Sequence, residues 1–559
     1  MNRNANSLFA VNATNVNISR SVCYRNQDIL TTMNFGDLVP FYVDEVLPGS
    51  TFSIDTSVVA RLSTPIHPTM GNANLDVYYF FVPNRLVWEH WTDFMGENNV
   101  GPWTPPVEYS IPQVKCGNEG FFKGSVADHF GIPTDVPNIS INAIPFRMYA
   151  LIWNQYFRSE SINDFAFLPK GDETVTIDDY IDLDANGNAF CGLKLLPVAK
   201  YFDYFTGCLP EPQRGEASNL PINFPEIVAN GPLTVDARSY TGSGFSQFND
   251  IPLNLMSNDS SSGSRFGNLG AYSTGTLFPS NNQSNASNSG NQVLYNSGLG
   301  LSEDRVSITI NELRLAFQIQ KLLEKDARGG GRYTSILLSH FAVQSPDARL
   351  QRAEYLGGKR IPINITQVLQ TSATDDVSPQ GNTAAYSLTS DMSSSFTKSF
   401  VEHGFVIGVC CLRTEHSYQQ GIEKMWSRRD RYDYYWPVLA NIGEQPVLNK
   451  EIFAQGTSED DEVFGYQEAW AEYRYKPNLI TGAFRSNYAQ SLDSWHYGDY
   501  YETLPTLSPD WLKETKVNVD RTLAISSELE DQCILNFYVK NKSVLPMPLR
   551  SIPGLIDHN

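Results

Sequence analysis

The stretch from Leu75 to Val82, which reads LDVYYFFV, is apolar at nearly every position. A strand with one buried face alternates apolar and polar residues, whereas a strand that is covered on both faces reads as a continuous apolar run. We therefore predict that this stretch is an inner strand with a packed layer on each side.

Three further stretches read as strands. Apolar residues occupy alternate positions in Thr51 to Val59, which is the period of a half-exposed strand. Phe405 to Leu412 and Cys533 to Val539 (CILNFYV) are more continuously apolar. More than 400 residues separate the first two strands from the last. A sheet that pairs them needs long crossing connections, as in Greek-key sandwiches.

The overall composition also favours strands. The chain has 559 residues, of which 12% are aromatic and only 18% are charged, below the ~25% charge of typical soluble proteins. It contains 39 Gly and 32 Pro. Aromatic residues favour strands, and Gly and Pro favour the turns that join them. The composition indicates a mainly β protein with many turns.

The formal net charge is −20. Proteins that coat nucleic acid by neutralising phosphates need clustered Lys and Arg. If this chain encloses DNA, a separate basic partner or a small basic patch must supply the cations.

Segments that would direct the chain to a membrane or a secretory route are not apparent. No stretch approaches the roughly 18 apolar residues that span a bilayer, and the Asn-rich first twenty residues lack the apolar core of a signal peptide. We expect the protein to be made and first used in a cytosol. Seven scattered Cys without a C-x-x-C pair favour buried reduced thiols over disulfides or zinc.

Few helices are expected. Thr309 and Glu312 form a capping box before a helical apolar pattern that should stop at Arg328, where three glycines follow. Shorter helices are predicted from Asn84 to Met95 and from Pro145 to about Arg158. Helices that lie between strands in this way indicate insertions in the loops that connect the strands.

One segment differs from the rest in composition. Between Ser257 and Gly300, 26 of 44 residues are Ser, Asn or Gly, too few apolar side chains for a core. It is either a free linker or an exposed excursion that packs against copies of itself. We predict three regions: residues 1–214, an inserted region 215–300, and residues 301–559.

Signatures of catalysis and of metal binding are weak. The sequence contains no H-E-x-x-H, no phosphate-binding loop and no G-x-S-x-G elbow. Asp182 to Gly187 resembles the start of a calcium loop, but Leu193 stands where that loop needs Glu, so a polar turn is favoured over a calcium site. The acidic run Ser458 to Glu462 and the scattered His residues, among them His416, are interpreted as structural. We predict no catalytic, cofactor-binding or metal-binding residue.

A basic cluster with neighbouring aromatic rings is the most informative local pattern. Arg428, Arg429 and Arg431 precede Tyr432 and Trp436. Guanidinium groups beside aromatic rings suit single-stranded DNA, because they neutralise phosphates while bases stack on the rings. Arg and Tyr are also enriched in protein interfaces. We favour an interface here, and DNA contact stays the alternative.

Four long stretches resemble the major capsid proteins of microviruses, particularly those of the gokushovirus branch. They are FGDLVPFYVDEVLPGSTF (Phe35 to Phe52), His67 to Glu97, Ala316 to Gly358, and FGYQEAWAEYRYKPNLITGAF (Phe464 to Phe484). The resemblance spans nearly the whole chain except Gly215 to Gly300.

The resemblance implies an eight-stranded jelly-roll β-barrel of the viral capsid type, with large loop insertions and a few short helices. It further implies pentamers and a sixty-copy (T=1) icosahedral shell around single-stranded DNA. The inserted region 215–300 would form a protrusion at the threefold axis that meets a host surface receptor. A small basic DNA-binding protein and a pilot protein would complete a virion assembled in the host cytoplasm.

We therefore expect a structural coat protein without catalytic activity. The alternative is a β-rich carbohydrate-binding or glycoside-hydrolysing protein, because Trp, Tyr, Asp and Glu are abundant. Such an enzyme would hold two carboxylates about 5–10 Å apart across a sugar cleft. A third possibility is a tail-like adhesin, which would form an elongated trimer instead of a shell.

Overall fold

Two compact units make up the chain, according to the computed structural model: Met1–Gly215 with Leu323–Asn559, here called the main unit, and Glu216–Leu322. The structure describes residues 19–97, 107–177, 193–215, 310–371, 380–381, 383–392 and 396–550, together with five strands between residues 234 and 296. The region boundaries predicted near residues 214 and 300 stay predictions.

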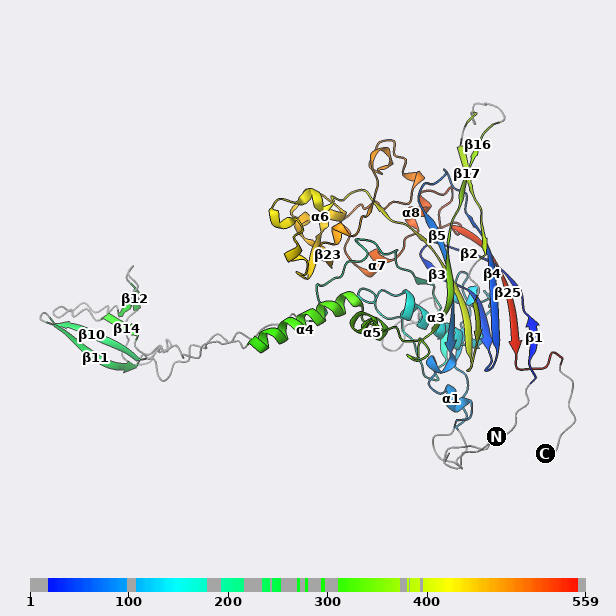
Figure 1. Cartoon of the computed structure of the whole chain (residues 1–559), viewed down its shortest axis with the longest axis horizontal. Coiled ribbons are helices and arrows are strands. Elements are labelled where there is room, and N and C mark those ends of the chain that lie inside the picture. Colours follow the sequence, from blue (N-terminus) through cyan, green and yellow to red (C-terminus); the bar gives the residue numbers. More distant parts are fainter. Residues whose placement is uncertain are drawn as a thin grey trace. The chain divides into compact units, whose positions relative to one another are not determined.

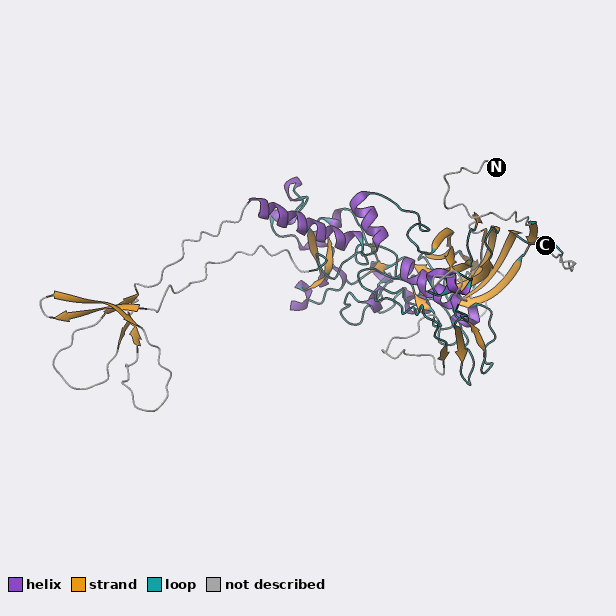
Figure 2. Cartoon of the chain, turned by 90° about the horizontal axis from the view of Figure 1, so that it is seen from below, coloured by secondary structure: helices purple, strands orange, loops and turns teal. Residues whose placement is uncertain are grey.

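Two antiparallel sheets contain the long strands of the main unit and lie at its right in Figures 1 and 2. In the first sheet, β25 (Cys533–Leu545) pairs on one side with two short edge strands that follow each other in the chain. On its other side β25 pairs with β4 (Thr51–Leu62), and β4 pairs in turn with two further short strands. Across this sheet the strands are β1 (Ser21–Tyr24) and β2 (Gln27–Met33), β25 (Cys533–Leu545), β4 (Thr51–Leu62), and β18 (Thr389–Met392) with β19 (Phe396–Ser399).

The second sheet has five strands. In order across the sheet they are β15 (Glu354–Pro362), β5 (Ala73–Pro83), β20 (Gly404–Thr414), β3 (Asp37–Val46) and the short β9 (Leu196–Pro197). All four pairings in this sheet are antiparallel. Each of the four strands predicted from the sequence is confirmed, as β4, β5, β20 and β25.

The main core lies between these two sheets. Alternate residues of β4 are buried, as the period-two pattern predicted, and the same alternation extends through most of β25. Their inward side chains pack against those of β3, β5 and β20 in one continuous cluster. At its centre, the rings of Phe41 and Phe537 stack with centroids 4.2 Å apart. The two sheets are therefore layers of one sandwich.

The second sheet is also covered on its other face. Phe80 and Val82 belong to a second cluster that includes Trp88 and the helix α3 (Ile144–Ile152). From α3, the Tyr149 hydroxyl donates to the carbonyl of Leu38 at 2.7 Å and accepts the N–H of Leu196 at 2.9 Å. β5 is buried at nearly every position as a result, which confirms the prediction of a strand covered on both sides.

The one charged residue of β5, Asp76, is fully buried. Its carboxylate is paired with Arg413 of β20 and, at 2.9 Å, with Arg360 of β15. The guanidinium groups of both arginines also lie over the ring of Tyr201, 4.2 and 4.1 Å from its centroid. An unpaired buried carboxylate would be costly, so these contacts are what permit an acid inside an apolar strand.

The predicted helices are found with different bounds. The longest, α4, spans Ile310–Gly329, and Thr309 of its predicted capping box lies outside the described residues. The helix predicted from Pro145 is α3, continued by the π-helical turn η2 (Trp153–Phe157). The prediction of one helix from Asn84 to Met95 is wrong. Two turns form instead, η1 (Asn84–Leu86) and α1 (Trp91–Phe94), because Val87 and Trp88 between them are fully buried in the core.

The remaining elements of the main unit are short. Between β5 and β15 they are β6 (Gln113–Cys116), α2 (Val126–His129), β7 (Ser140–Asn142), β8 (Val175–Ile177) and α5 (Tyr333–Phe341). Between β15 and β18 a hairpin is formed by β16 (Ile365–Leu369) and β17 (Thr383–Ser387). Between β20 and β25 lie β21 (Ser417–Tyr418), η3 (Lys424–Ser427), η4 (Arg431–Asp433), η5 (Pro437–Leu439), β22 (Glu444–Leu448), α6 (Asn449–Ile452), η6 (Ser458–Asp461), β23 (Val463–Glu468), η7 (Ala471–Tyr473), β24 (Asn478–Leu479), η8 (Gly482–Phe484), η9 (Asp493–Trp495), α7 (Pro509–Leu512) and α8 (Val517–Asp520).

The unit Glu216–Leu322 contains an antiparallel sheet of its own. Its strand order is β11 (Gly244–Pro252), β10 (Thr234–Thr241), β14 (Val293–Asn296), β13 (Leu277–Pro279) and β12 (Leu269–Ala271). The mainly β class is thus confirmed for both units. The described strands form open sheets with no closed barrel among them, so the jelly-roll connectivity stays a prediction.

The sandwich predicts opposite outcomes for two neighbouring residues of β25. Phe537→Ala should lower the free energy of unfolding by about 3–5 kcal/mol, because it opens a cavity where Phe537 stacks on Phe41. Tyr538→Ala, on the outward face, should change it by no more than about 0.5 kcal/mol. Urea denaturation of both variants measures this difference. Equal losses of unfolding free energy would contradict the placement of Phe537 in the core and of Tyr538 on the outward face.

Candidate functional site

The long connection between β20 and β25 carries the predicted Arg and Tyr cluster. Its residues 417–512, here called the connecting lobe, have a small core in which Tyr418, Val447, Ile452 and Phe464 are buried. Phe205, from the segment that follows β9, packs into the same core, 4.7 Å from the ring of Tyr418. Chain segments far apart in sequence therefore hold the lobe together.

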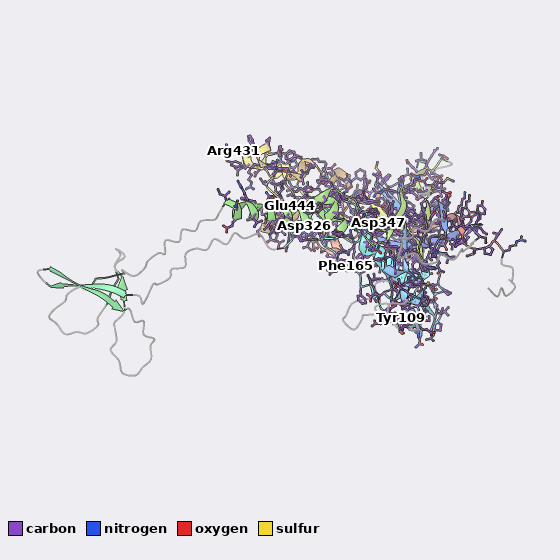
Figure 3. The ribbon with its side chains drawn as sticks, turned by 60° about the horizontal axis from the view of Figure 1, so that its bottom comes forward. Tyr109, Phe165, Asp326, Asp347, Arg431 and Glu444 are labelled. Atoms are coloured by element: carbon purple, nitrogen blue, oxygen red, sulfur yellow. The ribbon has the colours of Figure 1, made fainter. Side chains whose placement is uncertain are left out.

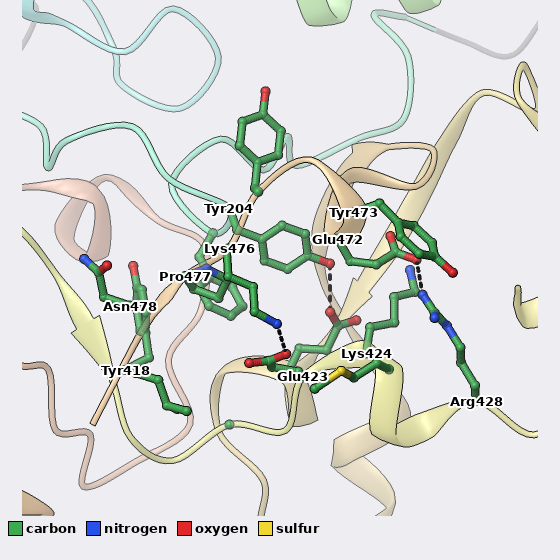
Figure 4. A pocket seen from close by; sticks show the side chains of 16 residues that line it. Tyr204, Tyr418, Glu423, Lys424, Arg428, Glu472, Tyr473, Lys476, Pro477 and Asn478 are labelled. Atoms are coloured by element: carbon green, nitrogen blue, oxygen red, sulfur yellow. Dashed lines mark hydrogen bonds and ion pairs between the residues drawn. The ribbon is translucent and has the colours of Figure 1, made fainter. Parts of the chain in front are cut away.

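Arg428 is an internal residue of this lobe. Its side chain is only 9% exposed, and its Nη2 atom donates to Glu472 Oε1 at 3.0 Å. The guanidinium carbon lies 4.6 Å from the ring centroid of Tyr473 and 5.2 Å from that of Tyr434. Figure 4 shows Arg428 and Glu472 facing each other beside Tyr473. This ion pair fixes the segment that follows to the body of the lobe.

The other residues of the predicted cluster lie at the surface. Asp433 accepts the backbone N–H groups of Asp430 and Arg429, at 2.9 and 2.7 Å, and these bonds lower the pKa of its carboxyl. Arg431 donates to the hydroxyl of Tyr432, and the Trp436 indole N–H donates to the Arg431 carbonyl at 2.8 Å. The turn is closed by its own hydrogen bonds, which leaves its rings free to face outward.

An apolar and aromatic surface results. Trp426 is 75% exposed, Tyr432 63% and Val438 93%. We call the aromatic surface the set of exposed side chains Met425, Trp426, Tyr432, Tyr434, Tyr435, Trp436 and Val438. In Figure 3, Arg431 lies at the outer margin of the main unit. Exposed apolar groups gathered on one segment are a common mark of a protein interaction site.

A cavity of about 330 Å³ lies beneath this segment. Tyr204 and Tyr418 line it on one side, and Arg428 and Tyr473 line it on another (Figure 4). Such a volume would suit a small ligand. However, most acidic and basic side chains that line the cavity already form hydrogen bonds or ion pairs with other residues of the protein.

Glu451 is the most buried acid of the cavity wall. It accepts from the Tyr204 hydroxyl at 2.8 Å and from the Leu448 N–H at 3.1 Å, and burial raises the pKa of its carboxyl. Glu423 is paired with Lys476 at the rim. These hydrogen bonds and this ion pair engage the carboxylates within the lobe.

A buried charge cluster joins the connecting lobe to the sandwich. His416, just after β20, contacts Asp499 at 2.9 Å through Nδ1 and Glu514 at 3.1 Å through Nε2. Since both carboxylates accept, both ring nitrogens must carry protons and the imidazole is charged. Burial opposes that charge, but Asp499 and Glu514 outweigh it and raise the pKa of His416 to about 9. Lys200 lies 3.6 Å from Asp499 and adds a second cation.

The acidic run Ser458 to Glu462 makes hydrogen bonds and an ion pair with nearby residues. Asp460 of the acidic run accepts the N–H groups of Gln455 and Gly456, and Asp461 pairs with Lys450. The resemblance to a calcium loop at 182–187 lies outside the described residues.

The described histidines differ from one another. His496 bonds to the Phe484 carbonyl, whereas His67 stacks on Trp495 with its Nδ1 unpartnered.

Within the described ranges, no group of three or more His, Cys, Asp or Glu side chains could hold a metal ion. Nor does any described helix have the length and apolarity needed to cross a membrane.

Comparison with known proteins shows the family of the chain. The family model described as capsid protein (F protein) matches residues 12–555. The chain is 41% identical to capsid protein VP1 of Bdellovibrio phage phiMH2K, 39% to that of Chlamydia phage 1 and 38% to that of Spiroplasma virus 4. Each alignment covers 96% of this chain and 96% of the relative.

The chain belongs to this capsid protein family. It is a structural major capsid protein, a component of the virion and not an enzyme. The resemblance to microvirus capsid proteins of the gokushovirus branch is confirmed, whereas the carbohydrate-binding or glycoside-hydrolysing alternative receives no support.

The sequence indicated the exposed residues of this site but not the distant residues that hold them in place. It identified the Arg and Tyr cluster from local composition, and Arg428 proved to be internal while Arg429 and Arg431 flank exposed rings. Glu472, which pairs with Arg428, is more than 40 residues away in sequence. The partners of His416 are 83 and 98 residues away. No spacing rule links such residues before the chain folds.

The burial of Arg428 predicts that it stabilises the lobe. Arg428→Met should lower the free energy of unfolding by roughly 3–5 kcal/mol, because it leaves Glu472 as an uncompensated, largely buried charge. Arg429→Met is the matched control and should change stability by less than about 0.5 kcal/mol. Thermal or urea unfolding measures both; a stable Arg428→Met variant would contradict the internal role.

The His416 cluster predicts a loss of stability in mild alkali. The pKa of His416 is about 9 in the folded protein and about 6.5 in the unfolded chain. Its contribution to the free energy of unfolding is therefore complete below about pH 6.5 and disappears as the pH rises through about 9. The expected loss between pH 6.5 and 9.5 is on the order of a few kcal/mol. Urea unfolding across this range should show that His416→Gln removes the dependence. If the free energy of unfolding of the variant depended on pH as that of the wild type does, a charged His416 in the folded protein would be contradicted.

Proposed function

We propose that this capsid protein assembles, through pentamers, into a closed icosahedral shell of sixty copies, and that its aromatic surface is buried between neighbouring copies. The observation that carries the proposal is the exposure of seven large apolar or aromatic side chains on one segment, residues 425–438. Permanent assemblies bury large and apolar interfaces. A subunit that stayed alone would keep these side chains in water.

The sandwich is proposed to be a jelly roll of the viral capsid type. Counting β1 with β2 and β18 with β19 as single interrupted strands, and leaving the two-residue β9 aside, the two described sheets of the sandwich have eight main strands. In chain order, strands one, eight, three and six form one sheet, and strands two, seven, four and five form the other. This order supports two nested Greek keys, the connectivity of double-sheet jelly rolls.

The Arg and Tyr cluster is assigned to the subunit interface and not to DNA. Arg428 is engaged with Glu472 inside the lobe, so it does not offer a free cation to a phosphate. Arg431 contacts Tyr432, and Asp430 and Asp433 lie in the same turn. The turn is thus nearly neutral, and its outward-facing groups are mostly aromatic, which suits protein contact better than phosphate binding.

Single-stranded DNA is the proposed content of the shell. The net charge of −20 means that most phosphates need cations from elsewhere. A small basic DNA-binding protein is the proposed source, and a pilot protein is proposed as a further virion component. Both follow from the resemblance to the gokushovirus branch.

The inserted region 215–300 is proposed to form a protrusion at the threefold axis that meets a host surface receptor. Two observations support an ordered excursion over a free linker. The residues from Glu216 to Leu322 form a compact unit of their own, and five strands within it pair into one sheet.

The assembly surface is tested by replacing two of its most exposed rings. Trp426→Ser with Tyr432→Ser should abolish particles and leave a folded subunit, because the variant loses interface contacts but no core contacts. Sedimentation of expressed protein measures assembly, and circular dichroism checks the fold. Tyr488→Ser, also an exposed tyrosine but outside the aromatic surface, is the control. Particles of normal yield from the double variant would contradict the proposal.

A further inference from the structure

The outward face of the first sheet is a second exposed surface with a different character. Side chains of β25 that point away from the core include Tyr538, Lys540 and Lys542, which are all exposed. Tyr24 of β1 is 73% exposed. These exposed side chains leave the face open among the described residues, and β1 and β25 lie at the margin of the main unit in Figure 1.

Strand register places these groups in rows across the sheet. Tyr24 lies opposite Lys542, which lies opposite Ser53 of β4, and Ser53 lies opposite Thr397 of β19. Cross-strand neighbours are about 5 Å apart, so this row presents a ring and a cation followed by two hydroxyl groups. A second row contains Asp28, Tyr538 and Ser57, and between the two rows Lys540 lies opposite Asp55.

The charge of this face is opposite in sign to that of the chain. Arg61, Lys540 and Lys542 face outward together with two acids, Asp28 and Asp55, which leaves a surplus of one positive charge (3 − 2). The whole chain carries −20. Lys540 Nζ also lies 5.9 Å from the ring centroid of Tyr538. Three cations and two exposed tyrosine rings therefore share this face of an otherwise acidic protein.

We propose that this face, centred on Tyr24, Tyr538, Lys540 and Lys542, binds the single-stranded nucleic acid inside the shell. Bases stack on the two rings, the lysines meet phosphates, and the serine and threonine hydroxyls donate to phosphate or base oxygens. Open sheets bind single strands in this way because every base has a stacking face. The inference rests on the proposed enclosure of single-stranded DNA and adds that the first sheet faces the interior.

The direct test is ultraviolet cross-linking of purified, DNA-filled particles, followed by mass spectrometry of the peptides. Nucleotide adducts are expected on the peptides that contain Tyr24 and Tyr538. Adducts confined to other peptides, for example residues 424–438, would overturn the proposal while leaving the shell intact. A chain that forms no particle would instead contradict the proposed function, so the two failures are distinguishable.

A charge variant gives an independent readout. Particles of Lys540→Gln/Lys542→Gln should release DNA at lower salt than wild type, with a salt dependence reduced by about two phosphate contacts. Lys115→Gln/Lys123→Gln makes the same charge change on exposed residues outside the first sheet and should match wild type. Equal release from both variants would overturn the proposal. Failure of only the first variant to assemble would also overturn it, since the face would then bind a second copy of the chain.

Discussion

Burial of both faces of the second sheet is the constraint on which the rest of the structure depends. β5 and β20 are apolar at nearly every position, so neither face can remain in water. One face is covered by the first sheet, whose strands come from both ends and from the middle of the described chain. The other is covered by α3 and the segments around it. These two coverings leave the outward face of the first sheet and the connecting lobe free for contacts with other molecules.

Buried charges mark the places where distant segments must meet. Asp76 holds β15, β5 and β20 together through two arginines and Tyr201. His416, Asp499, Glu514 and Lys200 join the sandwich to the connecting lobe. Removing one member of such a group leaves its partners uncompensated. These clusters therefore make the relative placement of the segments specific, whereas the apolar core alone would tolerate small shifts.

Much of the fold could be predicted from the sequence, and the reason lies in local periodicity. The pattern in Thr51 to Val59 depends only on which side chains face the core, and the structure reproduces it in β4. The helix expected from Asn84 failed because burial of Trp88 is a tertiary requirement that outweighs local capping preference. The Arg and Tyr cluster was recognised by composition, but composition could not separate Arg428, which is internal, from its exposed neighbours. The outward face of the first sheet was missed, because it is assembled from strands more than 500 residues apart, as the pairing of Tyr24 with Lys542 shows.

The most direct test of this account is a high-resolution electron cryomicroscopy reconstruction of particles formed by the full chain. We predict a closed shell in which residues 425–438 are buried against a neighbouring copy and the outward face of β25 points to the interior. A shell in which residues 425–438 remain in solvent and the first sheet faces outward would contradict the account.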